Sequence, residues 1–118
     1  MATSPTITRI ELIDFEICVE NIATDRAGSG VHYQPGPGGT QTRFALRVET
    51  DQGVTGEYIP PRGRAELVMA ATKFLAPRLI GQPVLERERL YREMRNATKH
   101  VGELGIGALD IALWDIAG

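Results

Sequence analysis

The 118-residue sequence has little of several features that mark a particular compartment or partner. Its single cysteine, Cys18, excludes an internal disulfide framework and favours a reducing, cytoplasmic environment. A net charge of −2 gives no electrostatic reason to expect nucleic acid or an anionic membrane as a partner. No apolar run approaches the roughly 20 residues that cross a membrane, and the N-terminus lacks the pattern of a signal peptide. The remaining composition, 42% apolar and 24% charged, is typical of one ordinary domain with its own core.

The residues that usually carry catalysis or bind metals are also sparse. His32 and His100 lie far apart, and neither has a second ligand at the spacing of a zinc site. No serine stands in a strand–turn–helix elbow, and no glycine cluster has the pattern of a dinucleotide or phosphate loop. Asp110 and Asp115 would point about 140° apart on a helix, so they cannot share a proton or a metal ion. We therefore predict no catalytic residue and no metal ligand in this chain, and we expect each of these acids to accept hydrogen bonds from neighbouring chain.

The first half of the chain predicts a three-stranded antiparallel meander. Residues 41–50 alternate between apolar and charged side chains, which is typical of a half-buried strand. Asp51-Gln52-Gly53 predicts a tight turn, and residues 54–59 return as the partner strand until Pro60-Pro61 ends the pairing. Residues 18–40 have no periodicity and become rich in glycine and proline, so a long loop is expected before the second strand.

The first strand, residues 6–17, carries apolar side chains of both parities. Ile10 and Leu12 belong to one face of the strand. Ile13 and Phe15 belong to the other. Either a bulge brings both sets onto one face, or the strand is buried on both sides, and the sequence does not decide between these alternatives.

The second half predicts three helices. Residues 63–79 carry apolar side chains at helical spacing, which indicates an amphipathic helix with these side chains on its core face: Leu67, Ala71, Phe74, Leu75 and Leu79. Residues 84–100 predict a second helix, whose interleaved Glu and Arg residues are expected on solvated faces. Residues 105–118 predict a third helix.

This last helix is apolar almost all round, so it must be buried on more than one side. Its large apolar residues are Ile106, Leu109, Ile111, Leu113, Trp114 and Ile116. Gly105 and Gly107 are expected where a loop passes into its first turn. The upstream residues offer too little to cover the helix, which predicts that the chain is the front part of a longer protein. The alternative is a stand-alone, non-enzymatic α+β module that buries this helix in a homodimer.

Several stretches together resemble one known family. Gly105-Ile-Gly-Ala-Leu-Asp-Ile-Ala-Leu-Trp-Asp-Ile-Ala-Gly118 closely resembles the signature that joins the two domains in the mandelate racemase/muconate lactonizing branch of the enolase superfamily. The hairpin Phe44–Glu57 resembles part of the N-terminal capping domain of that family. So does Leu79-Ile-Gly81, followed by Pro83 and a Glu/Arg-rich helix.

The resemblance implies an architecture for the chain. Residues 1–104 would form an α+β capping domain, in which a three-stranded antiparallel meander is followed by a helical bundle. Residues 105–118 would be the first helix of the junction with a modified TIM (β/α) barrel that is absent from this chain.

The resemblance also implies an activity for the longer protein. It would be an Mg²⁺-dependent dehydratase or racemase that abstracts a proton α to the carboxylate of a sugar acid or hydroxy acid. The Mg²⁺ ligands and the bases would lie in the barrel, so this chain alone is expected to be inactive. The expected partners are the barrel domain of the same protein, a small carboxylate substrate and other copies in a homo-oligomer, but neither nucleic acid nor a membrane.

Five residues are candidates for contact with that substrate. The resemblance places His32, Tyr33 and Gln34 in one lid loop over the mouth of the barrel, and Tyr58 through Arg62 in a second. An arginine there is suited to holding a carboxylate. Taken singly, these residue types fit ordinary surface decoration at least as well.

Overall fold

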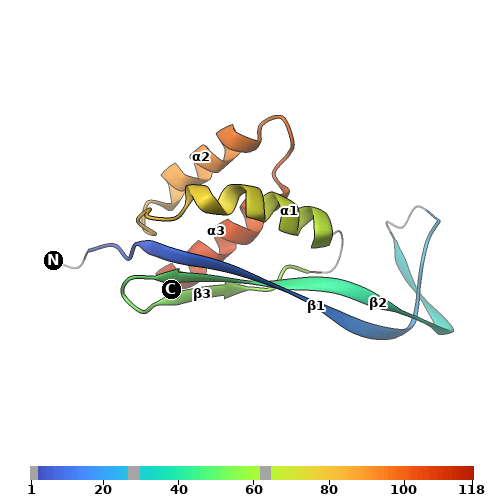
Figure 1. Ribbon diagram of the computed structural model, residues 1–118. Coiled ribbons are helices and arrows are strands. Elements are labelled where there is room, and N and C mark those ends of the chain that lie inside the picture. Colours follow the sequence, from blue (N-terminus) through green and yellow to red (C-terminus); the bar gives the residue numbers. More distant parts are fainter. Residues whose placement is uncertain (1–2, 27–29, 62–64) are drawn as a thin grey trace.

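The computed structural model describes residues 3–26, 30–61 and 65–118. A three-stranded antiparallel sheet, in the order β1-β2-β3, carries the described helices on one of its faces (Figure 1). This arrangement confirms the predicted α+β fold. The elements are β1 (Ile7–Thr24), β2 (Val31–Thr50), β3 (Thr55–Tyr58), α1 (Ala65–Leu75), the 3-10 turn η1 (Ala76–Arg78), α2 (Arg87–Thr98) and α3 (Leu104–Ala117).

Strands β1 and β2 form a much longer hairpin than the sequence predicted. Their ladder runs without a register shift across residues 9–20 of β1 and resumes across residues 22–24. The prediction of a long loop is therefore wrong for residues 18–24 and 31–40, which belong to the two strands. Glycine and proline indicated a loop there, but cross-strand backbone hydrogen bonds do not require apolar periodicity. Pro35 and Pro37, which cannot donate to a ladder, lie where the ladder is interrupted.

The regular register decides how the two apolar sets of β1 are placed. Ile10 and Leu12 pack against the core under the helices. Without a bulge between residues 9 and 20, Ile13 and Phe15 must point to the opposite face of the sheet. Figure 1 shows no described helix on that face, and 46% of Ile13 is exposed. Neither alternative holds in this chain: no bulge lies between the two sets, and the second apolar face of β1 is open rather than buried.

The core lies between the sheet and the helices. Phe44, Leu46 and Val48 alternate inward from β2 and are buried, as the pattern predicted. They meet apolar side chains of α3, among them Leu109 and Leu113, which are also fully buried. The sheet and α3 therefore form the centre of the domain.

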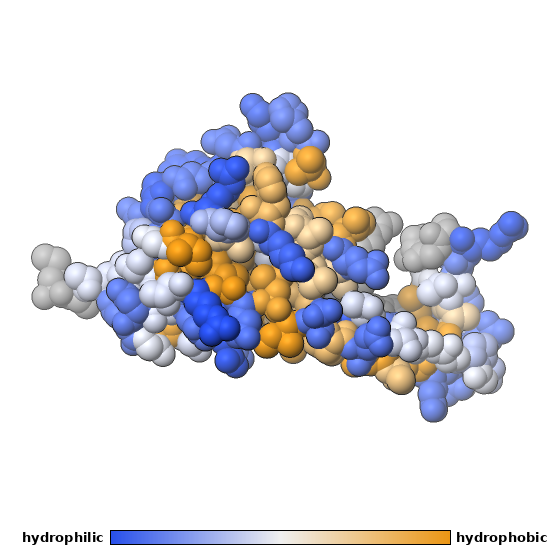
Figure 2. Space-filling view, in the orientation of Figure 1, coloured by the Kyte–Doolittle hydropathy of each residue, from blue (hydrophilic) through white to orange (hydrophobic). Residues whose placement is uncertain are grey.

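The core face of α1 agrees only in part with the prediction. Leu75, expected on that face, is buried, but Leu67 and Phe74, expected beside it, are exposed, and Thr72 is buried instead. Thr72 can be buried because its hydroxyl donates a hydrogen bond to the Val68 carbonyl oxygen at 2.7 Å, so the hydroxyl is not left without a partner. Figure 2 shows apolar surface gathered over α1 and β1 as a result.

Two glycines allow α3 to pack closely. A Cβ on Gly105 would lie 2.6 Å from the carbonyl carbon of Ala71 in α1, and a Cβ on Gly56 of β3 would overlap the Ala112 carbonyl oxygen. Gly105 is the second residue of α3 and lies in its first turn, as the sequence predicted. Its role is to let two helix backbones approach each other.

The upstream residues cover more of α3 than predicted, but they do not cover all of it. One stripe remains open: Leu104, Ile111 and Trp114 are 50%, 43% and 56% exposed. These residues lie along one side of the helix, at spacings of seven and three residues. We call them the α3 stripe.

The outer part of the hairpin makes the molecule elongated. The molecule measures 59 × 32 × 19 Å. Its radius of gyration, 16.6 Å, exceeds the roughly 13–14 Å of a compact chain of this length. Residues 15–24 and 31–43, which we call the arm, extend away from the helices (Figure 1).

Candidate functional site

One group of predicted site residues lies at the end of β3. Tyr58 pairs with Leu46 of β2 and is half-buried. The chain beyond it is tethered by Arg43, whose Nη2 donates a hydrogen bond to the Pro60 carbonyl oxygen at 2.9 Å. Arg43 was not singled out from the sequence, where it is one of several charged residues on an alternating strand. Arg62, the remaining predicted residue of this group, lies outside the described residues.

The other group lies far out on the arm. His32 and Tyr33 belong to strand β2 rather than to a loop, which corrects the prediction of a lid loop there. They pair with Ala23 and Ile22 respectively. Because neighbouring residues of a strand point to opposite faces, His32 and Tyr33 cannot both face the same small ligand. Gln34 is exposed and follows them in the interrupted part of the ladder.

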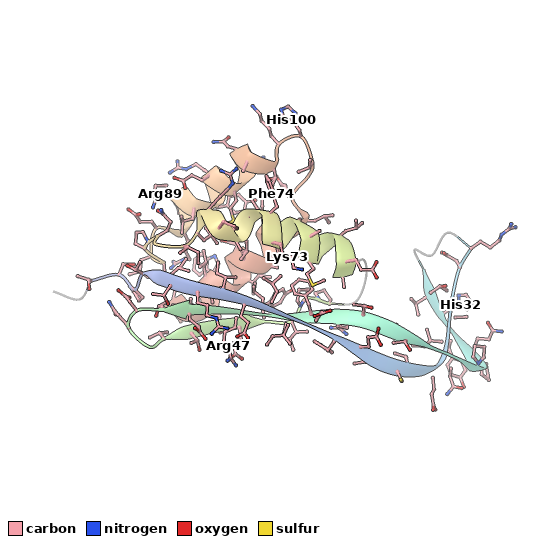
Figure 3. All side chains as sticks on the ribbon, in the orientation of Figure 1. His32, Arg47, Lys73, Phe74, Arg89 and His100 are labelled. Carbon is pink, nitrogen blue, oxygen red and sulfur yellow. The ribbon has the colours of Figure 1, made fainter. Side chains whose placement is uncertain are left out.

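The two groups do not meet within this chain. Between Gly38 and Leu46 the ladder is continuous for eight residues, which corresponds to about 26 Å of strand. Figure 3 shows His32 at the far end of the arm, away from the helices and from Arg47 at the centre of the sheet. Any site that uses both groups therefore needs a surface that the described residues do not provide.

A third feature, which the sequence did not reveal, is a hollow of about 210 Å³ between α2 and α3. The Arg87 guanidinium lies over the Trp114 ring, with its carbon 3.9 Å from the ring centroid. Its Nε and Nη1 atoms are buried and have no hydrogen-bond partner among the described residues. The alternating Glu and Arg of this segment indicated only a solvated face, and the stacking pair becomes apparent only once α2 lies beside α3.

The two aspartates of α3 have separate surroundings. Burial raises the pKa of Asp110, against the opposing effects of the Arg87 charge and of a hydrogen bond from Trp114. Asp115 Oδ2 accepts a hydrogen bond from the Glu57 backbone N–H at 2.9 Å, which ties α3 to β3. The expectation that Asp115 is held by neighbouring chain is confirmed.

No group of three or more His, Cys, Asp or Glu side chains within residues 3–26, 30–61 and 65–118 is placed to hold a metal ion. None of the described helices has the length and apolar character that crossing a membrane requires.

A model of a known family matches most of the chain. The family is described as the mandelate racemase / muconate lactonizing enzyme, N-terminal domain, and the match covers residues 21–118. The chain belongs to this family. The resemblance of its terminal motif and hairpin is thereby confirmed.

Curated relatives of this mandelate racemase/muconate lactonizing enzyme domain are dehydratases. The chain is 42% identical over 78 residues to D-galactonate dehydratase of Ralstonia pickettii, a match that covers 62% of this chain and 20% of that protein. D-galactonate dehydratase of Xanthomonas campestris pv. campestris is 38% identical over 78 residues, with the same coverage. The chain thus spans about a fifth of the length of the curated relatives that it matches.

Solved structures of the family share the fold. D-glucarate dehydratase from Agrobacterium tumefaciens, complexed with magnesium, matches 96% of this chain and 29% of its own, with a TM-score of 0.68 and 27% identity. A muconate cycloisomerase from Azorhizobium caulinodans matches 99% of this chain and 28% of its own, with a TM-score of 0.71 and 22% identity. The second likeness shows the fold alone.

Proposed function

We propose that this chain is the substrate-enclosing N-terminal domain of an Mg²⁺-dependent sugar-acid dehydratase of the enolase superfamily. The observation that carries the proposal is the family match over residues 21–118, together with 42% identity to a D-galactonate dehydratase. Dehydration is preferred to racemization because the curated relatives are dehydratases. The substrate class is a polyhydroxy carboxylate such as D-galactonate or D-glucarate.

The domain's own residues do not fit a magnesium site, because the described part of the chain offers no group of three acidic or histidine ligands. The proposal therefore assigns Mg²⁺ and the acid–base residues to the barrel of the complete protein. The domain from residue 1 to 104, with the junction helix 105–118, would contribute enclosure and specificity by excluding water from the substrate.

The enclosing residues would come from His32, Tyr33 and Gln34 on the arm, with only one of His32 and Tyr33 facing the substrate, and from Tyr58 and Arg62 after β3. Polar groups at the arm tip support this role: Tyr33 is 75% exposed and free to contact a ligand hydroxyl or carboxylate. Since the two groups lie apart, the proposal requires the barrel to fill the space between them.

The partner that we propose for the α3 stripe is that barrel. Burying a large apolar side chain contributes about 1.5–3 kcal/mol, and the unpaired nitrogens of Arg87 beside Trp114 would gain an acceptor there. The rival function is a stand-alone module that dimerises through its last helix. Such a dimer would bury less apolar surface than the sequence suggested, because most of α3 is already covered. A homo-oligomer of the complete enzyme stays a prediction.

The activity is tested on the complete protein that carries this chain. With Mg²⁺ and D-galactonate or D-glucarate, we expect loss of water and formation of a 2-keto-3-deoxy acid, and we expect removal of Mg²⁺ by EDTA to abolish turnover. The purified 118-residue chain should show no turnover under the same conditions. Racemization or cycloisomerization without dehydration of any sugar acid would contradict the proposal, as would turnover by the isolated chain.

The enclosing role is tested by substitution in the same protein. Because His32 and Tyr33 lie on opposite faces of the ribbon, only one of His32→Ala and Tyr33→Ala is expected to lower kcat/KM, by about tenfold. The other serves as its matched control. Arg62→Ala should lower kcat/KM mainly by raising KM, since it removes a contact to the carboxylate. Wild-type kinetics in all three variants would refute the lid assignment.

A further inference from the structure

The arm contains a sharp bend that determines where its tip points. At this bend the ladder shifts by three residues: Glu20 pairs with Gly38, but Ile22 pairs with Tyr33. Four residues of β2 therefore face the single residue Asn21 of β1. Figure 1 shows the tip of the arm turned back from the line of the rest of the hairpin. The bend thus determines the direction in which the predicted lid residues are presented.

Backbone donors are few on the β2 side of the bend. Of its four residues, 34–37, Pro35 and Pro37 have no N–H group, so only Gln34 and Gly36 can donate a backbone hydrogen bond there. The Gly36 N–H donates to the side-chain Oδ1 of Asn21 at 3.0 Å. The contact spans fifteen positions of sequence and joins the two strands where the regular ladder is interrupted.

The β1 side of the bend depends on the same residue. Asn21 has a φ of 58°, and it is the non-glycine residue with positive φ in the described part of the chain. Asparagine and aspartate tolerate this left-handed conformation better than other residues with a side chain, because their short polar groups can bond locally. Across the bend, Gly36 also has a positive φ, of 96°. Both strands are therefore turned at the level of one side-chain contact.

We propose that Asn21 is a positioning residue for substrate enclosure, which aims the arm tip with His32 and Tyr33 by fixing this bend through its left-handed backbone and its bond to the Gly36 N–H. The inference rests on the proposed function of the arm tip. Asn21 itself need not touch the substrate. Its role is to hold the tip residues in one direction relative to the body of the domain.

The test compares two substitutions of Asn21 in the complete protein. Asn21→Ala removes the acceptor and disfavours the left-handed backbone, whereas Asn21→Asp keeps an acceptor oxygen and tolerates positive φ. Glu20→Ala, one residue away in the regular ladder, is the matched control. Hydrogen exchange of the Gly36 amide is expected to be roughly tenfold faster in Asn21→Ala, and close to wild type in Asn21→Asp and Glu20→Ala.

Kinetics with D-galactonate or D-glucarate provide the second measurement. Asn21→Ala is expected to raise KM by about tenfold with little change in kcat. Asn21→Asp is expected to have a KM close to that of the wild type. A merely destabilising effect would instead lower the active fraction, and thus the apparent kcat, at unchanged KM. Unchanged KM in Asn21→Ala, while a tip variant at His32 or Tyr33 raises KM, would overturn the inference and leave the proposed function intact. Unchanged KM in the tip variants as well would overturn both.

Discussion

At the scale of single residues, the hollow between α2 and α3 combines groups that rarely stay at an open surface. The Trp114 ring is half-exposed but carries the Arg87 guanidinium on its face, a contact worth about 0.5–1 kcal/mol at such a site. Beside it, Asp110 is partly buried next to the same arginine. Tryptophan and arginine are also the residues enriched at the energetic centres of protein interfaces. The residue pattern thus supports the proposal that this side of α3 meets another domain.

The raised pKa of Asp110 predicts a pH-dependent stability. Folding favours the protonated carboxyl, so this residue stabilises the fold in acid, and the contribution is lost as the pH rises through the folded-state pKa. Asp110→Asn, which stays neutral, is therefore expected to raise the Tm of the 118-residue chain at pH 7 by about 1–3 °C. This gain in Tm should shrink as the pH falls toward 3.8, the ordinary pKa of an aspartate carboxyl. Thermal unfolding followed by circular dichroism between pH 4 and 7 measures it.

Glu88→Gln, on the exposed side of the same hollow, is the control for this prediction and should change Tm little, because its carboxylate is not buried. A lower Tm for Asp110→Asn at pH 7 would show that the Arg87 and Trp114 contacts outweigh the burial of the carboxylate.

At the scale of elements, the position of α3 is set by two close approaches. Gly105 lets α3 lie against the backbone of α1, and Gly56 lets it lie against β3. A hydrogen bond from the Glu57 N–H to Asp115 reinforces the second approach. Helix α3 is therefore an integral part of the core in this chain, and the domain boundary between residues 104 and 105 stays a prediction about the complete protein.

Paired glycine substitutions in α3 separate helix propensity from packing. Gly105→Ala places a Cβ against the Ala71 backbone and should destabilise the chain by about 1–3 kcal/mol. Gly107→Ala meets no atom within 4 Å and should stabilise it by up to about 1 kcal/mol, because alanine is the better helix former. Urea unfolding of both variants measures the difference. Equal effects would mean that α1 and α3 are not in contact at Gly105.

At the scale of the whole molecule, the chain leaves several apolar surfaces without cover. The α3 stripe is one of them, and the outer face of β1, with Ile13, is another. A two-stranded ribbon such as the arm is also only marginally stable when nothing packs on it. These surfaces fit a domain that belongs to a longer protein, in agreement with the 20% coverage of the curated relatives.

Trp114→Ala tests which surface meets the barrel. In the isolated chain the half-exposed ring contributes little to the free energy of unfolding, but in the complete protein it would be buried. The substitution should therefore lower the free energy of unfolding by about 1–2 kcal/mol more in the complete protein. Leu67→Ala, also 56% exposed but on α1, is the control and should cost about the same in both proteins. Denaturant unfolding of the four variants and of the two unsubstituted proteins gives the comparison. Equal costs for Trp114→Ala in both contexts would place the barrel elsewhere.

The sequence by itself determined the features that depend on local patterns. The alternation of Phe44, Leu46 and Val48 predicted a half-buried strand, and the composition of residues 105–118 predicted an apolar helix. The terminal motif identified the family. Each of these signals comes from neighbouring residues along the chain, because strand and helix periodicities are local properties.

Only the tertiary structure decided which residues meet. The arm, residues 15–24 and 31–43, depends on cross-strand hydrogen bonds that glycine and threonine make as well as apolar residues do. Which side of α1 is buried depends on how the helix packs on the rest of the fold. The need for glycine at position 105 depends on the backbone of Ala71, thirty-four positions away. Pairing and packing between distant segments have no signature in a local pattern, so the long hairpin, its bend and the Arg87–Trp114 contact emerged only from the folded chain.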